Sequence, residues 1–169
     1  MNKPTLRLLP VLLLALATLT LPACGFQPRG ALPQISGIPG PLYVSGVEQW
    51  TPLHREISRQ LQQAGISVTH DGQQAASQLR IADRQSRRRL LSVDSRNQAA
   101  EYELEESFRF SVRSPAAGEL VKDQTVRVLR ILFRPTDQVL AREREEAHLR
   151  EDMRRELVAR MLQRIDAQN

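Results

Sequence analysis

The sequence has little of the material from which most catalytic and metal sites are built. Among 169 residues there is one cysteine and there are three histidines, which excludes an intrachain disulfide and a cysteine-rich zinc site. The histidines lie far apart, in neither an HxH nor an HExxH spacing. Glycine-rich phosphate-binding patterns are missing as well. We therefore expect a protein that is not an enzyme and that carries no metal ion and no cofactor.

A long hydrophobic run occurs at the N-terminus. Lys3 and Arg7 precede an apolar stretch from Leu8 to Leu21, which is followed by Pro22-Ala23. A positive flank, an apolar run and small residues after it are typical of an export signal. As a membrane span the run is short, and Pro10 interrupts it. Residues 1–23 are therefore predicted to be a signal peptide.

The single cysteine, Cys24, directly follows this signal. Its position after Leu-Pro-Ala resembles a bacterial lipobox, in which the cysteine is acylated, for example with palmitate, and becomes the mature N-terminus. Several acyl chains anchor a protein permanently in a membrane. Gly25 follows the cysteine, and by resemblance to lipoprotein sorting rules this favours the outer membrane. The alternative is ordinary signal cleavage that leaves a free thiol.

Lysine is almost absent from the rest of the chain. All but Lys3 and Lys122 of the 24 basic residues are arginines, and the formal net charge is +5. Guanidinium groups form paired hydrogen bonds with phosphates and carboxylates. For an exported chain we expect the partner to be an anionic lipid or glycolipid headgroup, or an acidic protein surface, and not nucleic acid.

A tether and one domain follow the signal. Proline and glycine are dense in residues 24–41, which predicts an extended lipidated tether. The domain is expected to span residues 42–166, with residues 167–169 as a tail. Thr51 and Pro52 are suited to begin a helix that Gly65 ends. Alternating and helical apolar spacings predict the elements 42–47 (strand), 52–64 (helix), 66–68 (strand end), 79–93 (strand), 101–113 (strand), 125–134 (strand) and 137–166 (helix).

The order of these elements predicts an α+β fold. We expect a two-layer sandwich, in which two helices cover one face of a mixed, mostly antiparallel four-stranded sheet. Val126 and Val128 fall on one face of the last strand, whereas Leu129, Ile131 and Phe133 fall on the other. This change of phase predicts a bulge or a strand that is covered on both faces. Glu106 interrupts an apolar strand face and is expected to mark a bulge or to pair with an arginine.

Three segments resemble those of a known family. Residues 24–30 read CGFQPRG, residues 100–104 read AEYEL, and the final helix carries LARE at 140–143 and continues through Asp152-Met153-Arg154. Together, and in this order, they are similar to the lipopolysaccharide-assembly lipoprotein family LptE. The resemblance implies an outer-membrane lipoprotein inside the large barrel LptD, on the periplasmic side and in the barrel lumen. There it would act as plug and assembly factor and bind lipopolysaccharide during its insertion into the outer leaflet.

The residues by themselves lead only to an outer-membrane lipoprotein with a compact α+β domain. A second interpretation therefore stays open, namely a lipid-anchored structural adaptor of another envelope complex without a ligand of its own. Candidate lipopolysaccharide-binding residues are Arg96, before the AEY strand, and Arg142, at the start of the last helix, where the family carries basic residues. The run Arg87-Arg88-Arg89 is a weaker candidate, since charge on a strand edge also protects it from aggregation.

Overall fold

A computed structural model describes residues 35–133 and 139–168, and within the last helix it describes side chains from residue 143 on. These residues belong to one compact unit that spans Leu32–Asn169. The predicted signal peptide, Cys24 and most of the predicted tether lie outside the described residues. No helix in the described part of the chain is both long enough and apolar enough to cross a membrane.

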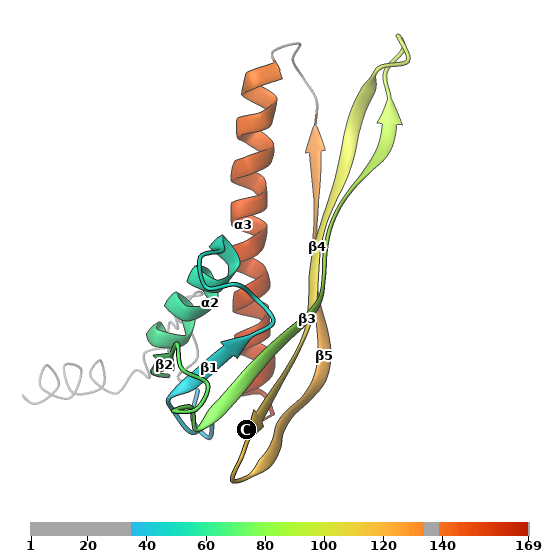
Figure 1. The fold of residues 1–169 in the computed structure, drawn as a ribbon. Coiled ribbons are helices and arrows are strands. Elements are labelled where there is room, and N and C mark those ends of the chain that lie inside the picture. Colours follow the sequence, from blue (N-terminus) through green and yellow to red (C-terminus); the bar gives the residue numbers. More distant parts are fainter. Residues whose placement is uncertain (1–34, 134–138, 169) are drawn as a thin grey trace, which may run out of the picture. The chain divides into compact units, whose positions relative to one another are not determined.

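The unit is a two-layer α+β sandwich, as the order of elements predicted (Figure 1). One mixed sheet has the strand order β2-β1-β3-β4-β5. β1 is parallel to its two neighbours, and β3, β4 and β5 are antiparallel. Both helices cover the same face of this sheet (Figure 1). The elements are β1 (Leu42–Ser45), α2 (Pro52–Gln63), β2 (Val68–Thr69), β3 (Ser77–Val93), β4 (Ala99–Ser114), β5 (Gly118–Phe133) and α3 (Val139–Asp166).

The sheet has five strands where four were expected. The additional strand is β2, whose two residues pair with Leu42 and Tyr43 of β1. The sequence indicated only a strand end at this place, because a two-residue strand has too few positions to establish an alternation.

Helix α2 begins and ends where its sequence predicted. The Thr51 hydroxyl accepts a hydrogen bond from the His54 N–H at 3.3 Å, and Pro52 occupies the first turn, where its missing N–H is not needed. Gly65, with φ +86°, follows the last residues of the helix. Gln60 then joins the two helices, since its side-chain amide donates to the Arg155 carbonyl of α3 at 3.0 Å.

The sheet narrows from five strands to three where β1 and β2 end. Gly46 lies so close to β3 that a Cβ at this position would be 1.9 Å from the Ile81 carbonyl oxygen. Directly beyond, β3 has a register shift between Ala82 and Gln85, and Asp83 has φ +49°. A bulge of this kind bends a strand, and beyond it the β3–β4 hairpin leans away from α3 (Figure 1).

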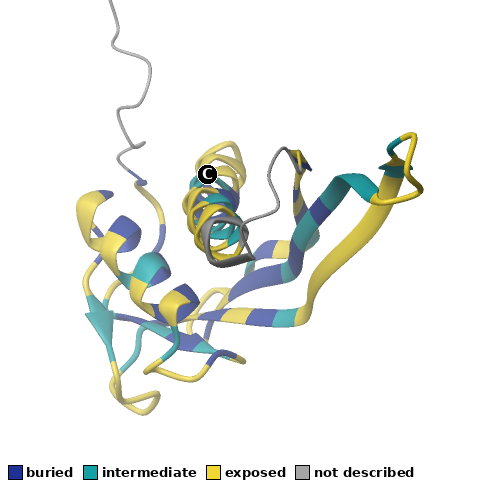
Figure 2. Ribbon diagram, turned by 90° about the horizontal axis from the view of Figure 1, so that it is seen from above, coloured by how far each residue is buried: buried dark blue, intermediate teal, exposed yellow. Residues whose placement is uncertain are grey.

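This bend separates two regions. The first region, the base, consists of the five-stranded end of the sheet, α2, and α3 from Met153 on. The second region, the tip, is the three-stranded remainder of the sheet together with α3 up to Asp152. Its strands are β3 from Arg84, β4 up to Glu106 and β5 from Leu129. Buried residues concentrate in the base, whereas exposed ones dominate the hairpin of the tip (Figure 2). From α3, the buried side chains are Met153, Leu157, Val158, Met161, Leu162 and Ile165.

The bulge expected where the apolar pattern of β5 changes phase, between Val128 and Leu129, is absent, and at that place the prediction was wrong. Residues 124–133 pair with β4 in an unbroken register, and the extra residues of β5 lie nearer the base, between Glu119 and Gln124, opposite Phe110 to Arg113 of β4. Val126 and Val128 are buried, but Leu129, Ile131 and Phe133 are exposed. Apolar residues on both faces of a strand are buried on both faces only if other parts of the chain pack against each face. Within the described residues nothing buries the outer face here.

Candidate functional site

The turn of the β3–β4 hairpin holds Arg96 at the far end of the tip. Asp94 opens the turn, and its Oδ1 accepts hydrogen bonds from the N–H groups of Arg96 and Gln98, each at 2.9 Å. Asn97 takes the left-handed conformation with φ +60°, which asparagine tolerates better than most residues. The turn is therefore stabilised by hydrogen bonds between its own backbone and the Asp94 side chain.

The Asp94 carboxylate also contacts the side chain of Arg96, which projects from the turn. The Gln98 N–H, together with the N–H and the guanidinium of Arg96, holds the pKa of Asp94 below its usual value. The Arg96 Nε lies 3.5 Å from Asp94 Oδ2, and the Arg96 side chain is 72% exposed. This loose ion pair leaves most of the guanidinium accessible to an anion in solvent.

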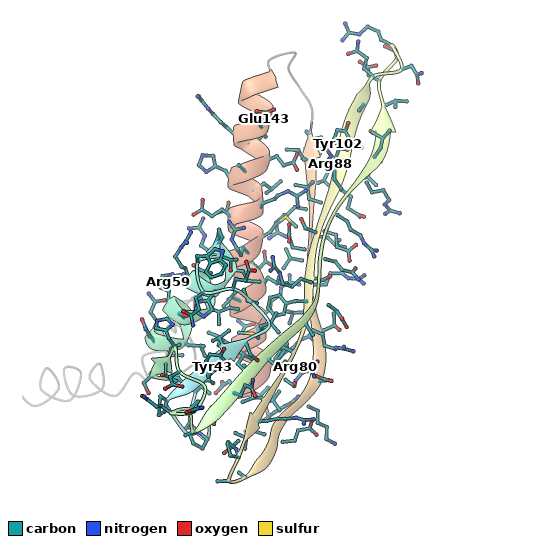
Figure 3. The ribbon with its side chains drawn as sticks, viewed as in Figure 1. Tyr43, Arg59, Arg80, Arg88, Tyr102 and Glu143 are labelled. Carbon is teal, nitrogen blue, oxygen red and sulfur yellow. The ribbon has the colours of Figure 1, made fainter. Side chains whose placement is uncertain are left out.

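The three consecutive arginines divide between the two faces of the sheet, because successive side chains of a strand point to opposite faces. Arg88 points to the helix side, where its Nη1 lies 3.1 Å from Glu146 Oε2. Its guanidinium carbon also lies 5.0 Å from the centre of the Tyr102 ring, and both side chains are labelled in Figure 3. Arg88 is thus engaged in holding β3, β4 and α3 together.

Arg88 belongs to a polar cluster between α3 and the sheet. Arg150 of α3 lies 2.6 Å from Glu106 Oε1 and 2.9 Å from Glu146 Oε1. It also donates to the Ser86 hydroxyl at 2.7 Å, and that hydroxyl donates to Glu106 at 2.7 Å. The predicted pairing of Glu106 with an arginine is confirmed. In the tip, charged hydrogen bonds thus join helix and sheet beside a smaller apolar core, to which β4 and β5 contribute the buried Leu104 and Leu132.

Arg87 and Arg89 lie on the outer face of the sheet. They line a groove of about 360 Å³ with Glu103 and Glu105 of β4 and Arg127 and Leu129 of β5. Arg89 pairs with Glu103 at 2.9 Å, and Arg127 pairs with Glu105 at 3.1 Å. Arg87 has no carboxylate partner among the described residues. The sequence alone did not point to Arg127, since only the β4–β5 register brings it beside β3.

Arg142 lies in the first turn of α3, and its side chain is outside the described part of the structure. The start of α3 and the β3–β4 turn lie at the same end of the unit (Figure 1). The fold therefore brings the backbone segments that carry Arg96 and Arg142 to one end. Glu146, one turn further along α3, is bonded to Arg88 and Arg150.

A second groove, of about 620 Å³, lies at the opposite end of the sheet. Tyr43, Gln78, Arg113 and Glu119 contribute to its lining, and Arg113 lies 3.7 Å from Glu119. Glu119 is the single carboxylate in this lining. In the described ranges, histidines and carboxylates form no group of three or more that would suit a metal ion.

The chain matches known proteins along most of its length. A model of the family LptE, described as lipopolysaccharide-assembly, matches residues 40–165. A protein named LPS-assembly lipoprotein LptE from Photorhabdus laumondii is 27% identical over 154 residues, which are 91% of this chain and 83% of that protein. Its counterpart of the same name from Pectobacterium atrosepticum is 26% identical over 155 residues, with the same shares covered.

Solved structures share the fold. A solution structure of lipoprotein B from Nitrosomonas europaea has a TM-score of 0.65 at 23% identity, covering 85% of this chain and 91% of that one. A crystal structure of the rare lipoprotein B from Shewanella oneidensis has a TM-score of 0.62 at 24% identity, covering 72% and 90%. The two-layer arrangement is therefore that of known bacterial lipoproteins.

Proposed function

Since the chain belongs to the lipopolysaccharide-assembly family LptE, we propose that it is an outer-membrane lipoprotein that partners the LptD barrel and binds lipopolysaccharide during its insertion into the outer leaflet. In this role it is a plug and assembly factor and performs no catalysis. Lipidation at Cys24 anchors it, and the folded unit extends from the periplasmic side into the barrel lumen.

The observation that carries this proposal is the match to the family over residues 40–165. The dimensions of the unit agree with a plug. The 28 residues of α3 span about 42 Å at ~1.5 Å per residue. A bilayer with its headgroups is ~40–45 Å thick. A unit of this height can contact a barrel along most of the membrane.

The arginines of the tip suit the anionic part of the glycolipid. Lipopolysaccharide presents phosphates and carboxylates, which guanidinium groups bind through paired hydrogen bonds. Arg96 is mostly exposed, and Arg142 belongs to the same end of the unit. We assign the first contacts to these two residues, and secondary contacts to Arg87 and Arg89 on the outer face. Arg88 supports them through its pairing with Glu146.

The association is tested by purifying the tagged lipoprotein from outer membranes in mild detergent and identifying what accompanies it by mass spectrometry. The proposal predicts LptD in near-equal amount. The alternative, an adaptor of another envelope complex, predicts different partners and an unchanged content of lipopolysaccharide in the outer leaflet. Recovery of the lipoprotein without LptD would contradict the proposal.

The ligand assignment is tested by Arg96→Glu combined with Arg142→Glu. Two charge reversals at the tip should weaken lipopolysaccharide binding about tenfold or more, because each removes a charged hydrogen bond and adds repulsion. Recovery of LptD should be unchanged. Arg80→Glu with Arg113→Glu makes the same charge change on the exposed outer face of the base and should leave binding intact. Equal binding by both double variants would show that Arg96 and Arg142 do not hold the ligand.

A further inference from the structure

The outer edge of β5 changes along its length. β5 is the last strand of the sheet, so every second residue directs its N–H and C=O away from β4. Hydrogen bonds from α3 side chains to β5 carbonyls show which residues these are. Arg164 donates to the Thr125 carbonyl, and Arg160 donates to the Arg127 carbonyl at 2.9 Å. The odd-numbered residues of β5 therefore form the edge, and its half nearer the base is covered by arginines.

The half nearer the tip is open. The register of β5 is unbroken from residue 124 to 133, so Leu129, Ile131 and Phe133 direct their backbone groups to the same edge. The Leu129 carbonyl is taken by the Arg130 side chain at 2.9 Å. Among the described residues, nothing bonds to the edge-facing groups of Ile131 and Phe133.

The same three residues expose apolar side chains on the outer face. Leu129 is 45% exposed, Ile131 is 51% exposed and Phe133 is 59% exposed. An open edge with apolar residues at alternating positions is a surface on which proteins aggregate unless it is paired. Natural sheets protect such edges with charge or proline, and on β5 the arginines protect only the half nearer the base.

We propose that residues 129–133 of β5 bind an extended segment of the partner barrel protein, which adds to the sheet as a sixth strand. Strand addition takes its affinity from main-chain hydrogen bonds and its specificity from alternate side chains. The proposal rests on the proposed function, since it names the surface through which the chain meets LptD. Lipid is the less suitable occupant, because acyl chains offer nothing to the free N–H groups.

Charge along the edge specifies the sequence of the bound segment. Arg160 is balanced by Glu156 at 2.6 Å, but Arg164 has no carboxylate partner among the described residues. A segment that continues along β5 toward the base meets this guanidinium. It should therefore carry apolar residues at alternate positions opposite Leu129, Ile131 and Phe133, followed by an acidic residue beside Arg164.

Two substitutions of Ile131 separate the main-chain contribution from that of the side chain. Ile131→Pro keeps an apolar side chain and removes the N–H that faces the edge, at a position where proline costs no bond to β4. Ile131→Thr keeps the N–H and removes most of the apolar surface. Strand addition predicts that the proline variant recovers about tenfold less LptD from co-expressing cells than wild type, and clearly less than the threonine variant.

The same preparations give a direct measure of pairing. In the wild-type complex, amide exchange at Ile131 and Phe133 should be slower than in the free lipoprotein. The thermal unfolding of each free variant verifies that the proline variant folds. A stronger loss with threonine than with proline, or unchanged exchange at Ile131 in a complex that forms, would overturn the proposal and leave the proposed function standing.

Two further outcomes are distinguishable. If wild type recovers no LptD, the proposed function fails, and this inference fails with it. If the free lipoprotein is a dimer that Ile131→Pro converts to a monomer while recovery of LptD is unchanged, the edge pairs with a second copy of the chain. That result also contradicts the proposal.

Discussion

The base and the tip are made from the same three long strands and the same helix, but they are held together by different forces. In the base, Leu157, Met161 and Ile165 of α3 belong to one hydrophobic core together with the buried valines of β5 and the apolar residues of α2. In the tip, Arg150 and Glu106 occupy the equivalent place between helix and sheet. Apolar burial stabilises more than a largely buried ion pair, because the attraction between the two charges is offset by the cost of removing them from water. The base therefore accounts for most of the stability, and the tip is available for recognition.

The strongest test of this comparison is at the junction of the two regions. Gly46→Ala would place a Cβ 1.9 Å from the Ile81 carbonyl oxygen, at a residue with φ +79°. Strain and overpacking should together lower the free energy of unfolding by about 4 kcal/mol. Gly65→Ala is the matched control, with φ +86° and open space, and should cost about 1 kcal/mol. Urea unfolding measures both, and equal losses would contradict the account.

Two leucines on α3 compare the regions directly. Leu162 is fully buried in the base, and Leu162→Ala should cost about 3 kcal/mol. Leu149 is only partly buried beside the core, and Leu149→Ala should cost less than about 1 kcal/mol. Urea unfolding of the two variants tests the difference. A similar cost at both sites would mean that the tip is packed as well as the base.

The polar cluster gives a smaller effect. Glu106→Gln keeps the shape of the side chain but removes the charge that meets Arg150 at 2.6 Å. We expect a loss of about 1 kcal/mol, with faster amide exchange in the tip and little change in the base. Glu119→Gln removes an exposed partner of Arg113 at 3.7 Å, and its cost should be below about 0.5 kcal/mol. Faster exchange in the base of the Glu106 variant would contradict the division.

The smallest predicted effect is a pH dependence in the base. Burial, together with the nearby His70, lowers the pKa of His54 below 6.5. Below pH 6.5 the unfolded chain therefore takes up a proton that the folded chain does not, and the stability declines with falling pH until the folded pKa is passed. Unfolding measured between about pH 7.5 and 5.5 should show this decline. It should weaken in His54→Asn and persist in His148→Asn, which alters an exposed residue of α3; an unchanged decline in both would contradict the assignment.

The sequence predicted the base better than the tip, for a physical reason. Periodicity reports which residues are buried, so it located α2, α3 and the strand that carries the buried Phe108 and Phe110. It did not predict that Arg127 joins the outer groove or that Arg160 and Arg164 cover the edge of β5. These contacts depend on strand register and on residues distant in sequence, which a local pattern does not contain.

The outward residues of β5 illustrate the same limit. Leu129, Ile131 and Phe133 suggested a bulge or a second cover, because alternation alone does not distinguish a covered face from an exposed one. Their exposure is what identifies a surface available to a partner. The assignment of Arg96 and Arg142 came from the family resemblance, and it remains a prediction until ligand binding is measured.

Hydrogen exchange along β4 compares the stability of the base and the tip within one strand, because β4 runs through both regions. In the free protein, amides near Phe108 and Phe110 should exchange only by global unfolding, and those near Ala99 to Tyr102 by local opening at lower free energy. Added lipopolysaccharide should slow exchange in the tip and leave the base unchanged. Uniform protection along β4 in the free protein, or slowing confined to the base when lipopolysaccharide is added, would contradict the account.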